Sequence, residues 1–165
     1  MQVVTAAQMQ AMDRETIDTT GIPGQVLMEN AGRGATHCFL KSVFSKSGAT
    51  VGVMAGRGNN GGDGFGMARY LAQRGINVRV FLLSTRNRVQ GDAAANLKLL
   101  DTLKVPVIEM PDEQHFNDHL AQLNHIDCWI DAIFGTGLNA DVRGYYKKVI
   151  DFINATEKPV FAVDI

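Results

Sequence analysis

Two amides and a carboxylate lie within a glycine-rich stretch of the chain, AGRGNNGGDGFGMARYL. Asn59, Asn60 and Asp63 bring side-chain oxygens that can bind a hard cation or hydrogen-bond the polar groups of a ligand. The five glycines at positions 56, 58, 61, 62 and 64 would let backbone amides come close to that ligand. The opposing interpretation is a tight turn from a strand into a helix, in which Asp63 only caps the helix.

The start of this stretch, GRGNNG, fits the G-x-G-x-x-G pattern of dinucleotide-binding loops. That fingerprint also needs an acidic residue about twenty residues further on, which binds the ribose. Here the region reads VFLLSTRN, and no Asp or Glu follows until Asp92. A Walker loop needs Gly-Lys-Ser/Thr, and this loop has no lysine. The sequence therefore disfavours a dinucleotide-dependent oxidoreductase and a P-loop NTPase.

Two further segments carry polar residues at the ends of expected strands. DAIFGTGLNADVRG contains Asp131, followed by apolar residues and a glycine turn at 135–137, and the last strand carries Asp164. A carboxylate among buried residues needs a partner or a cation. Because ligands bind at the carboxyl edge of an open parallel sheet, we expect Asn60, Asp131 and Asp164 to converge on one site there.

The elements that would position these residues follow from hydrophobic periodicity. A capping box formed by Thr5 and Gln8 predicts a helix to about Thr19, and a second helix follows to about Leu40. From residue 49 onward, the strand-like runs ATVGVMAG, NVRVFLL, VPVIEM, DCWIDAIF and PVFAVDI alternate with helical runs. This pattern predicts an α/β fold, a Rossmann-like doubly wound and mostly parallel sheet with helices on both faces, preceded by two N-terminal helices, in three α/β/α layers.

The length and composition suit one soluble globular domain. The chain has 165 residues, 45% of them hydrophobic, and a net charge of −1. Without a basic or acidic block, we expect no nucleic-acid and no membrane partner. The start, MQVVTAAQMQ, lacks a secretory signal, so a cytoplasmic protein is expected. We expect residues 1–165 to form one domain that lacks its C-terminal part, because the chain stops on the last apolar residue of an expected buried strand.

Several other candidate residues have simple interpretations. Cys38 and Cys128 are expected to be buried free thiols rather than a disulfide or a metal pair. His115 and His119 are expected to form a solvated surface pair rather than a metal site, because no third ligand is near them in the sequence. Trp129 is expected in the core.

Two pairs of residues leave alternatives open. Glu29 and Asn30, in LMENAG, either approach the substrate from the second helix or belong to close helix packing. Tyr145 and Tyr146 open a helix, where they either shield an adenine or face solvent.

Taken together, NNGGDG, DAIFGTGL, the preceding LMENAG and the final AVDI strand resemble the YjeF N-terminal domain family over essentially the whole chain. The enzymatic members of that family are NAD(P)H-hydrate epimerases. They interconvert the R and S forms of hydrated NADH and NADPH (NADHX and NADPHX) in the repair of nicotinamide cofactors. The resemblance implies this isomerase activity. The alternative, a non-catalytic ligand-binding or dimerisation module of the same fold, is disfavoured because the Asn and Asp residues are all present.

The resemblance also implies which residues form the site. One potassium ion per subunit would be held by Asn60 and Asp131, and the serine of a Pro-Ser-Gly that follows AVDI in the family would complete the ion site. Asp164 would contact the substrate, and its carboxylate is our candidate for general acid and base. Arg143 would supply the positive charge that many members carry earlier in this segment. The implied substrate-binding residues are Asn59, Asn60, Gly61, Gly62, Asp63, Gly135, Thr136, Gly137, Leu138, Asn139, Ala140, Asp141, Arg143 and Asp164.

Partners are implied by the same resemblance. The small-molecule substrate would be NADHX or NADPHX. An ADP- or ATP-dependent NAD(P)H-hydrate dehydratase, either fused to this chain or separate, would then use one epimer. We also expect a homodimer.

Overall fold

The structure is a computed structural model that describes residues 4–44 and 48–164. Its five strands form one parallel sheet in the order β3-β2-β1-β4-β5. They are β1 (Thr50–Ala55), β2 (Asn77–Leu82), β3 (Val107–Glu109), β4 (Cys128–Ala132) and β5 (Val160–Ala162). The strand order reverses between β1 and β4, which is the switch point at which open α/β sheets bind ligands.

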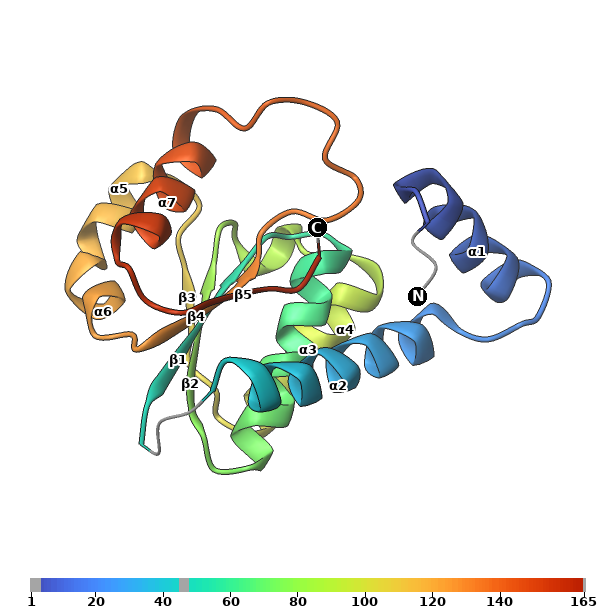
Figure 1. Ribbon diagram of the computed structural model, residues 1–165, viewed down its shortest axis with the longest axis horizontal. Coiled ribbons are helices and arrows are strands. Elements are labelled where there is room, and N and C mark those ends of the chain that lie inside the picture. Colours follow the sequence, from blue (N-terminus) through green and yellow to red (C-terminus); the bar gives the residue numbers. More distant parts are fainter. Residues whose placement is uncertain (1–3, 45–47, 165) are drawn as a thin grey trace.

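Helices cover both faces of this sheet (Figure 1). On one face lie α2 (Gly24–Ser42), α3 (Asn59–Gln73) and α4 (Gly91–Thr102), and on the other α5 (Glu113–Asp118), α6 (Leu120–Asn124) and α7 (Gly144–Ala155). The remaining elements are α1 (Ala6–Asp18) and a short 3-10 helix, η1 (Arg86–Arg88). The predicted fold class and the two N-terminal helices are confirmed. None of the described helices has both the length and the apolar character needed to cross a bilayer.

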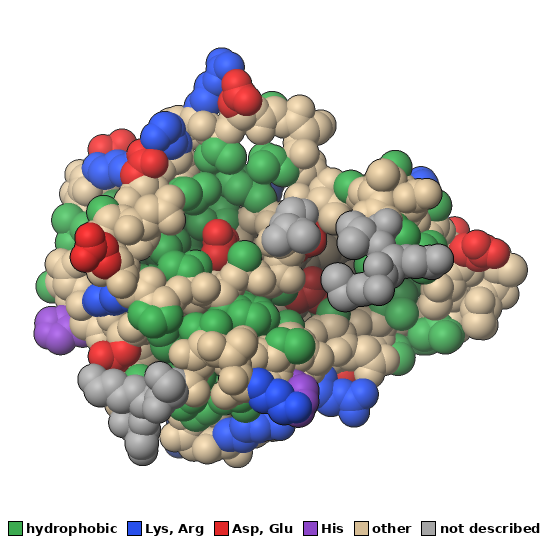
Figure 2. All heavy atoms as spheres, in the orientation of Figure 1, with side chains coloured by type: hydrophobic (Ala, Val, Ile, Leu, Met, Phe, Trp, Pro, Cys, Tyr) green, Lys and Arg blue, Asp and Glu red, His purple; other side chains and the backbone are tan. Residues whose placement is uncertain are grey.

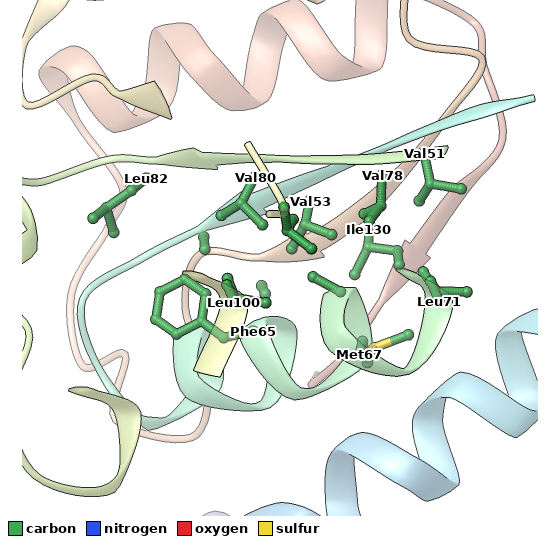
Figure 3. Close-up of a cluster of buried hydrophobic side chains, with 14 of the residues drawn as sticks. Val51, Val53, Phe65, Met67, Leu71, Val78, Val80, Leu82, Leu100 and Ile130 are labelled. Atoms are coloured by element: carbon green, nitrogen blue, oxygen red, sulfur yellow. The ribbon is translucent and has the colours of Figure 1, made fainter. Parts of the chain in front are cut away.

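The core has two parts because alternate residues of a strand point to opposite faces of the sheet. Val53 and Ile130 pack with Phe65 of α3 on the face that α2, α3 and α4 cover (Figure 3). Phe81 and Trp129 pack on the other face. The expectation that Trp129 lies in the core is confirmed. The sheet is therefore a rigid platform whose carboxyl edge presents the loops described below.

Two burial predictions were wrong. Cys38 is exposed on α2, whereas Cys128 is buried, and burial raises the pKa of the Cys128 thiol to about 11. The final strand is not buried, since β5 lies at the edge of the sheet and Val160 is 40% exposed. An edge strand has one paired neighbour instead of two, and hydrophobicity alone does not distinguish the two positions.

The two tyrosine hydroxyls and Glu29 make hydrogen bonds within the protein. The Tyr145 hydroxyl donates to the carbonyl of Met110 at 2.7 Å, and the Tyr146 hydroxyl to that of Leu83 at 3.3 Å. Both rings are half-buried against the sheet, so the expectation that they face solvent is wrong, and the shielding of an adenine stays a prediction.

Glu29 accepts hydrogen bonds from Arg69 and from the Tyr70 hydroxyl, which ties α2 to α3. Burial opposes ionisation of Glu29, but these two bonds outweigh it and lower the pKa of the carboxyl. The helix-packing interpretation of Glu29 therefore holds. His115 is exposed and paired with Asp112, as expected for a surface residue.

Candidate active site

The glycine stretch turns the chain from β1 into α3. This fifteen-residue helix begins at Asn59, and its N-cap, Gly58, offers no side-chain hydrogen bond. The first N–H groups of α3 therefore lack a capping side chain, which makes this helix end suited to an anion. Asp63 lies within the helix and is half-buried, so the interpretation of Asp63 as a cap is wrong.

Close backbone contacts explain two of the glycines. A side chain on Gly61 would overlap the carbonyl oxygen of Gly56, and one on Gly56 would overlap the carbonyl oxygen of Ile133. The Gly56 N–H also donates to the carbonyl of Ala132 at 2.9 Å. The turn after β1 thus packs directly on the turn after β4, and no residue larger than glycine fits at this contact.

Asn60 joins the same two turns with its side chain. It is buried, and its Nδ2 donates to the carbonyl of Phe134 at 2.6 Å. Its Oδ1 is buried without a hydrogen-bond partner. Because buried polar atoms are nearly always paired in folded proteins, this oxygen indicates where a ligand atom or a cation would bind.

The end of β5 completes the arrangement. The Thr136 N–H donates to Asp164 Oδ2 at 2.8 Å. A Cβ atom on Gly135 would lie 2.6 Å from Asp164 Oδ2 and 3.1 Å from Asn60 Cβ. Asn60, residues 135–136 and Asp164 therefore come together at the carboxyl edge of the sheet, although they are scattered through the sequence. This group of residues is called the buried corner below.

Asp63 is the most strongly perturbed carboxyl of this site. Burial, followed by the nearby charges of Asp164 and Asp13, raises its pKa to about 7. The site therefore holds two carboxyl groups whose charges interact, Asp63 and Asp164, and the second accepts the Thr136 N–H.

Asp131 reaches the sheet edge from the other face. It lies on β4 between Met54 of β1 and Ala162 of β5, and alternation along the strand places its side chain on the side of Trp129. Burial raises the pKa of this carboxyl, while its 3.0 Å hydrogen bond from the Ile133 N–H lowers it.

A cation at this edge would find oxygen donors. In residues 4–44 and 48–164 no three His, Cys, Asp or Glu side chains gather into a metal cluster. The Asn60 Oδ1 atom and the Asp131 carboxylate are oxygen donors, the type that hard cations prefer and transition metals do not.

Most of the remaining sequence-predicted residues lie in an exposed loop, away from Asn60 and Asp164. The loop of residues 137–143 arches over a hollow in which hydrophobic side chains gather (Figures 1 and 2). Arg143 pairs with Asp141 at 3.3 Å, with both side chains more than 80% exposed. The exposed predicted residues that the structure does not bring to the carboxylates are Asn59, Gly137, Leu138, Asn139, Ala140, Asp141 and Arg143.

Sequence reasoning missed two residues of α1. Gln10 Nε2 donates to the carbonyl of Thr136 at 3.4 Å, and Asp13 is near enough to Asp63 to affect its ionisation. Both are exposed polar residues on an ordinary solvated helix. Their spacing of three residues, which puts them on one face, was the one available signal.

Comparisons with known proteins are consistent across sequence and structure. Residues 24–165 match the family model described as YjeF-related protein N-terminus. A protein of Limosilactobacillus fermentum named NAD(P)H-hydrate epimerase is 37% identical over 164 residues, which cover 99% of this chain and 74% of that protein. The bifunctional NAD(P)H-hydrate repair enzyme Nnr of Salinibacter ruber is 36% identical over 99% of this chain, which spans only 31% of that longer protein. The crystal structure of the yeast protein ynu0 superposes with a TM-score of 0.84 at 29% identity and covers all of this chain and 70% of the yeast chain.

Proposed function

This chain belongs to the family of YjeF-related protein N-termini, and we propose from that membership that it is an NAD(P)H-hydrate epimerase. It would interconvert the R and S forms of NADHX and NADPHX, the substrates that the names of its curated relatives indicate. The observation that carries the proposal is the convergence of Asn60, Thr136 and Asp164 on one sheet edge. We also propose that residues 1–165 form one domain of this type and act in the cytoplasm.

Substrate binding would use both turns. The uncapped N-terminus of α3, residues 59–63, is suited to the diphosphate because its N–H groups and the helix dipole both favour anions. Residues 135–141 and Arg143 would line the rest of the nucleotide, with the exposed loop closing over it. The buried corner would face the hydrated ring.

A potassium ion would be held by Asn60 and Asp131. The assignment is supported by the buried Asn60 Oδ1, which has no hydrogen-bond partner among the described residues, and by the half-buried Asp131 carboxylate, whose ionisation burial opposes. When bound, the ion would supply a fixed positive charge between the turns after β1 and β4. Its low charge density makes it a structural rather than a water-activating ion.

Epimerisation requires that one bond at a single ring carbon break and re-form on the other face, with protons moved to and from the attached oxygen. In the hydrate, that ring carbon carries a hydroxyl and is bonded to the ring nitrogen. Inversion follows if a base takes the hydroxyl proton and a proton is delivered to the ring nitrogen, which keeps the bonding electrons as the C–N bond breaks to give an aldehyde. When the nitrogen attacks the other face of the aldehyde, it loses that proton and the new alkoxide oxygen is protonated. Inversion also follows if the protonated hydroxyl leaves as water, which then adds to the opposite face and returns its proton. We propose Asp164 as the acid and base on either route.

The direct test is incubation of one purified epimer of NADPHX with the chain, followed by chromatography of both epimers over time. Asp164→Asn should lower the rate by about a thousandfold while circular dichroism and thermal stability stay close to those of the wild type. Asp118→Asn, on α5, is the matched control and should keep the wild-type rate. An Asp164→Asn variant as fast as the wild type would remove this residue from the mechanism.

Partners follow from the same proposal. A dehydratase that accepts one epimer, fused or separate, would consume the product, as the name of the bifunctional relatives suggests. We also propose a homodimer, because Met9 and Met12 of α1 are 44% and 53% exposed and would be covered by a second copy. Sedimentation should give twice the chain mass, and Met12→Glu should give a monomer.

A further inference from the structure

α1 is attached to the domain by few contacts. None of its thirteen residues is buried, and the matched family region begins after it, at residue 24. The helix is nevertheless well formed, because Thr5 and Gln8 make a reciprocal capping box. Burial of apolar side chains in the core therefore does not explain why α1 lies beside the domain.

One face of α1 is turned toward the sheet edge. Gln10 and Asp13 are three residues apart and Ile17 follows four later, so their side chains share a face. Gln10 contacts the Thr136 carbonyl, Asp13 acts on Asp63, and the end of Ile17 lies near Gly24 at the start of α2. α1 therefore spans the site from the turn after β4 to the start of α2 (Figure 1).

Both backbone polar groups of Thr136, which belong to two successive peptide groups, make a hydrogen bond to a side chain. The N–H is bound by Asp164 at 2.8 Å, and the carbonyl accepts from Gln10 at 3.4 Å. The Leu138 N–H then closes a turn on the Gly135 carbonyl at 3.0 Å, and the exposed loop begins. The direction in which this loop leaves the buried corner is thus set at Thr136, and Gln10 is one of the two side chains that fix it.

We infer that α1 is a wall of the active site and that Gln10 is a positioning residue, which orients the loop of residues 137–143 over the bound nucleotide. This inference rests on the proposed epimerase function. Gln10 acts through the Thr136 carbonyl rather than on the reacting carbon, so its loss weakens nucleotide binding more than it slows the chemical step. Asp164 keeps its own bond to the Thr136 N–H when Gln10 is changed.

The experiment compares Gln10→Glu with Gln8→Glu in the full chain. The two changes are isosteric and add the same charge to the same helix, on faces about 160° apart. Glu at position 8 preserves the capping box, because a carboxylate accepts from Thr5 as the amide oxygen does. Glu at position 10 removes the donor and places an acceptor against the Thr136 carbonyl.

Two quantities are measured, the KM and kcat for NADPHX epimerisation and the calorimetric affinity for NADP⁺, which carries the diphosphate without the hydrated ring. We expect Gln10→Glu to raise KM and the NADP⁺ Kd by about fivefold to tenfold, with kcat within about twofold. Gln8→Glu should match the wild type in every quantity. Equal behaviour of the two variants, or a fall in kcat without a change in KM, would overturn the inference.

Failure of the proposed function gives a different result. A wild-type chain that binds NADP⁺ without interconverting the epimers refutes the epimerase, and the NADP⁺ comparison of the two variants still decides the role of Gln10. A wild-type chain that neither interconverts the epimers nor binds NADP⁺ refutes both.

Discussion

Replacing Asp63 by Asn should stabilise the protein at alkaline pH and change its stability little at acidic pH. Burial and the charges of Asp164 and Asp13 raise the pKa of Asp63 from 3.8 to about 7. Between these two values the folded state binds the proton and the unfolded state does not. Stability therefore falls as pH rises through this interval and is lowest above the folded-state pKa. The amide of Asn has nearly the shape of the protonated carboxyl and cannot ionise, so it escapes this loss.

The magnitude follows from the size of the shift. A rise in pKa from 3.8 to about 7 corresponds to roughly 4 kcal/mol at full effect. Asp63 is only half-buried, and screening by solvent reduces that figure, so we expect Asn to stabilise by about 2 kcal/mol at pH 8. At pH 4 the difference should be below about 0.5 kcal/mol. For a chain of this length, the effect at pH 8 corresponds to a rise in Tm of roughly 4–8 °C.

The assay is urea unfolding, followed by circular dichroism, at half-unit steps from pH 4 to pH 8.5 and at constant ionic strength. Asp13→Asn removes one of the charges that raise the pKa of Asp63, so its stability should depend less on pH. Glu15→Gln, on the opposite face of α1, is the matched control and should follow the wild type. An equal change in stability at every pH would contradict this prediction, because it means that the pKa of Asp63 is the same in the folded and unfolded states. Destabilisation at pH 8 would also contradict it, because it means that Asp63 is ionised and well paired.

Three further outcomes are expected. Gly61→Ala should abolish folding or sharply lower the yield of folded protein, because the added methyl overlaps a backbone carbonyl oxygen. Gly58→Ala has open space around its Cβ position and should lower the free energy of unfolding in urea by at most about 0.5 kcal/mol. Glu29→Ala leaves the largely buried Arg69 without its carboxylate and should destabilise by about 2 kcal/mol in the same assay. In thermal unfolding, KCl should raise the Tm more than LiCl does at equal ionic strength, and Asp131→Asn should remove that difference.

The order of the elements could be predicted from the sequence because one physical signal repeats. Short runs rich in Val and Ile alternate with amphipathic segments, and only a parallel sheet covered on both faces satisfies that alternation. The position of each strand within the sheet could not be predicted in the same way. The last strand, β5, has the same apolar composition as the central strands but lies at the edge. Its neighbours, not its residues, determine its exposure.

The site could be predicted only where it depends on strand ends. Asn60 and Asp164 each follow a strand, and parallel strands end at one edge, so their meeting could be expected. Asp63 is open to misinterpretation, since its role depends on whether α3 begins at residue 59 or five residues later. Gln10 shares one face of α1 with Asp13, but such spacing is common on solvated helices and indicates a role only once the Thr136 carbonyl lies opposite it.

The contacts divide the site into a fixed part and an adjustable part. Gly56 and Gly61 lock the turns after β1 and β4 together, and Asn60 bonds across them, so these turns move only as one body. The loop of residues 137–143 is largely exposed and no residue of α1 is buried, so these parts are packed less tightly than the two turns. An epimerase must accept two substrates whose hydroxyls lie on opposite faces of the same ring. The two locked turns would hold the part of the nucleotide that both epimers share, while the loop of residues 137–143 and α1 would accommodate a hydroxyl on either face of the ring. A uniformly rigid pocket would instead favour one epimer and trap it.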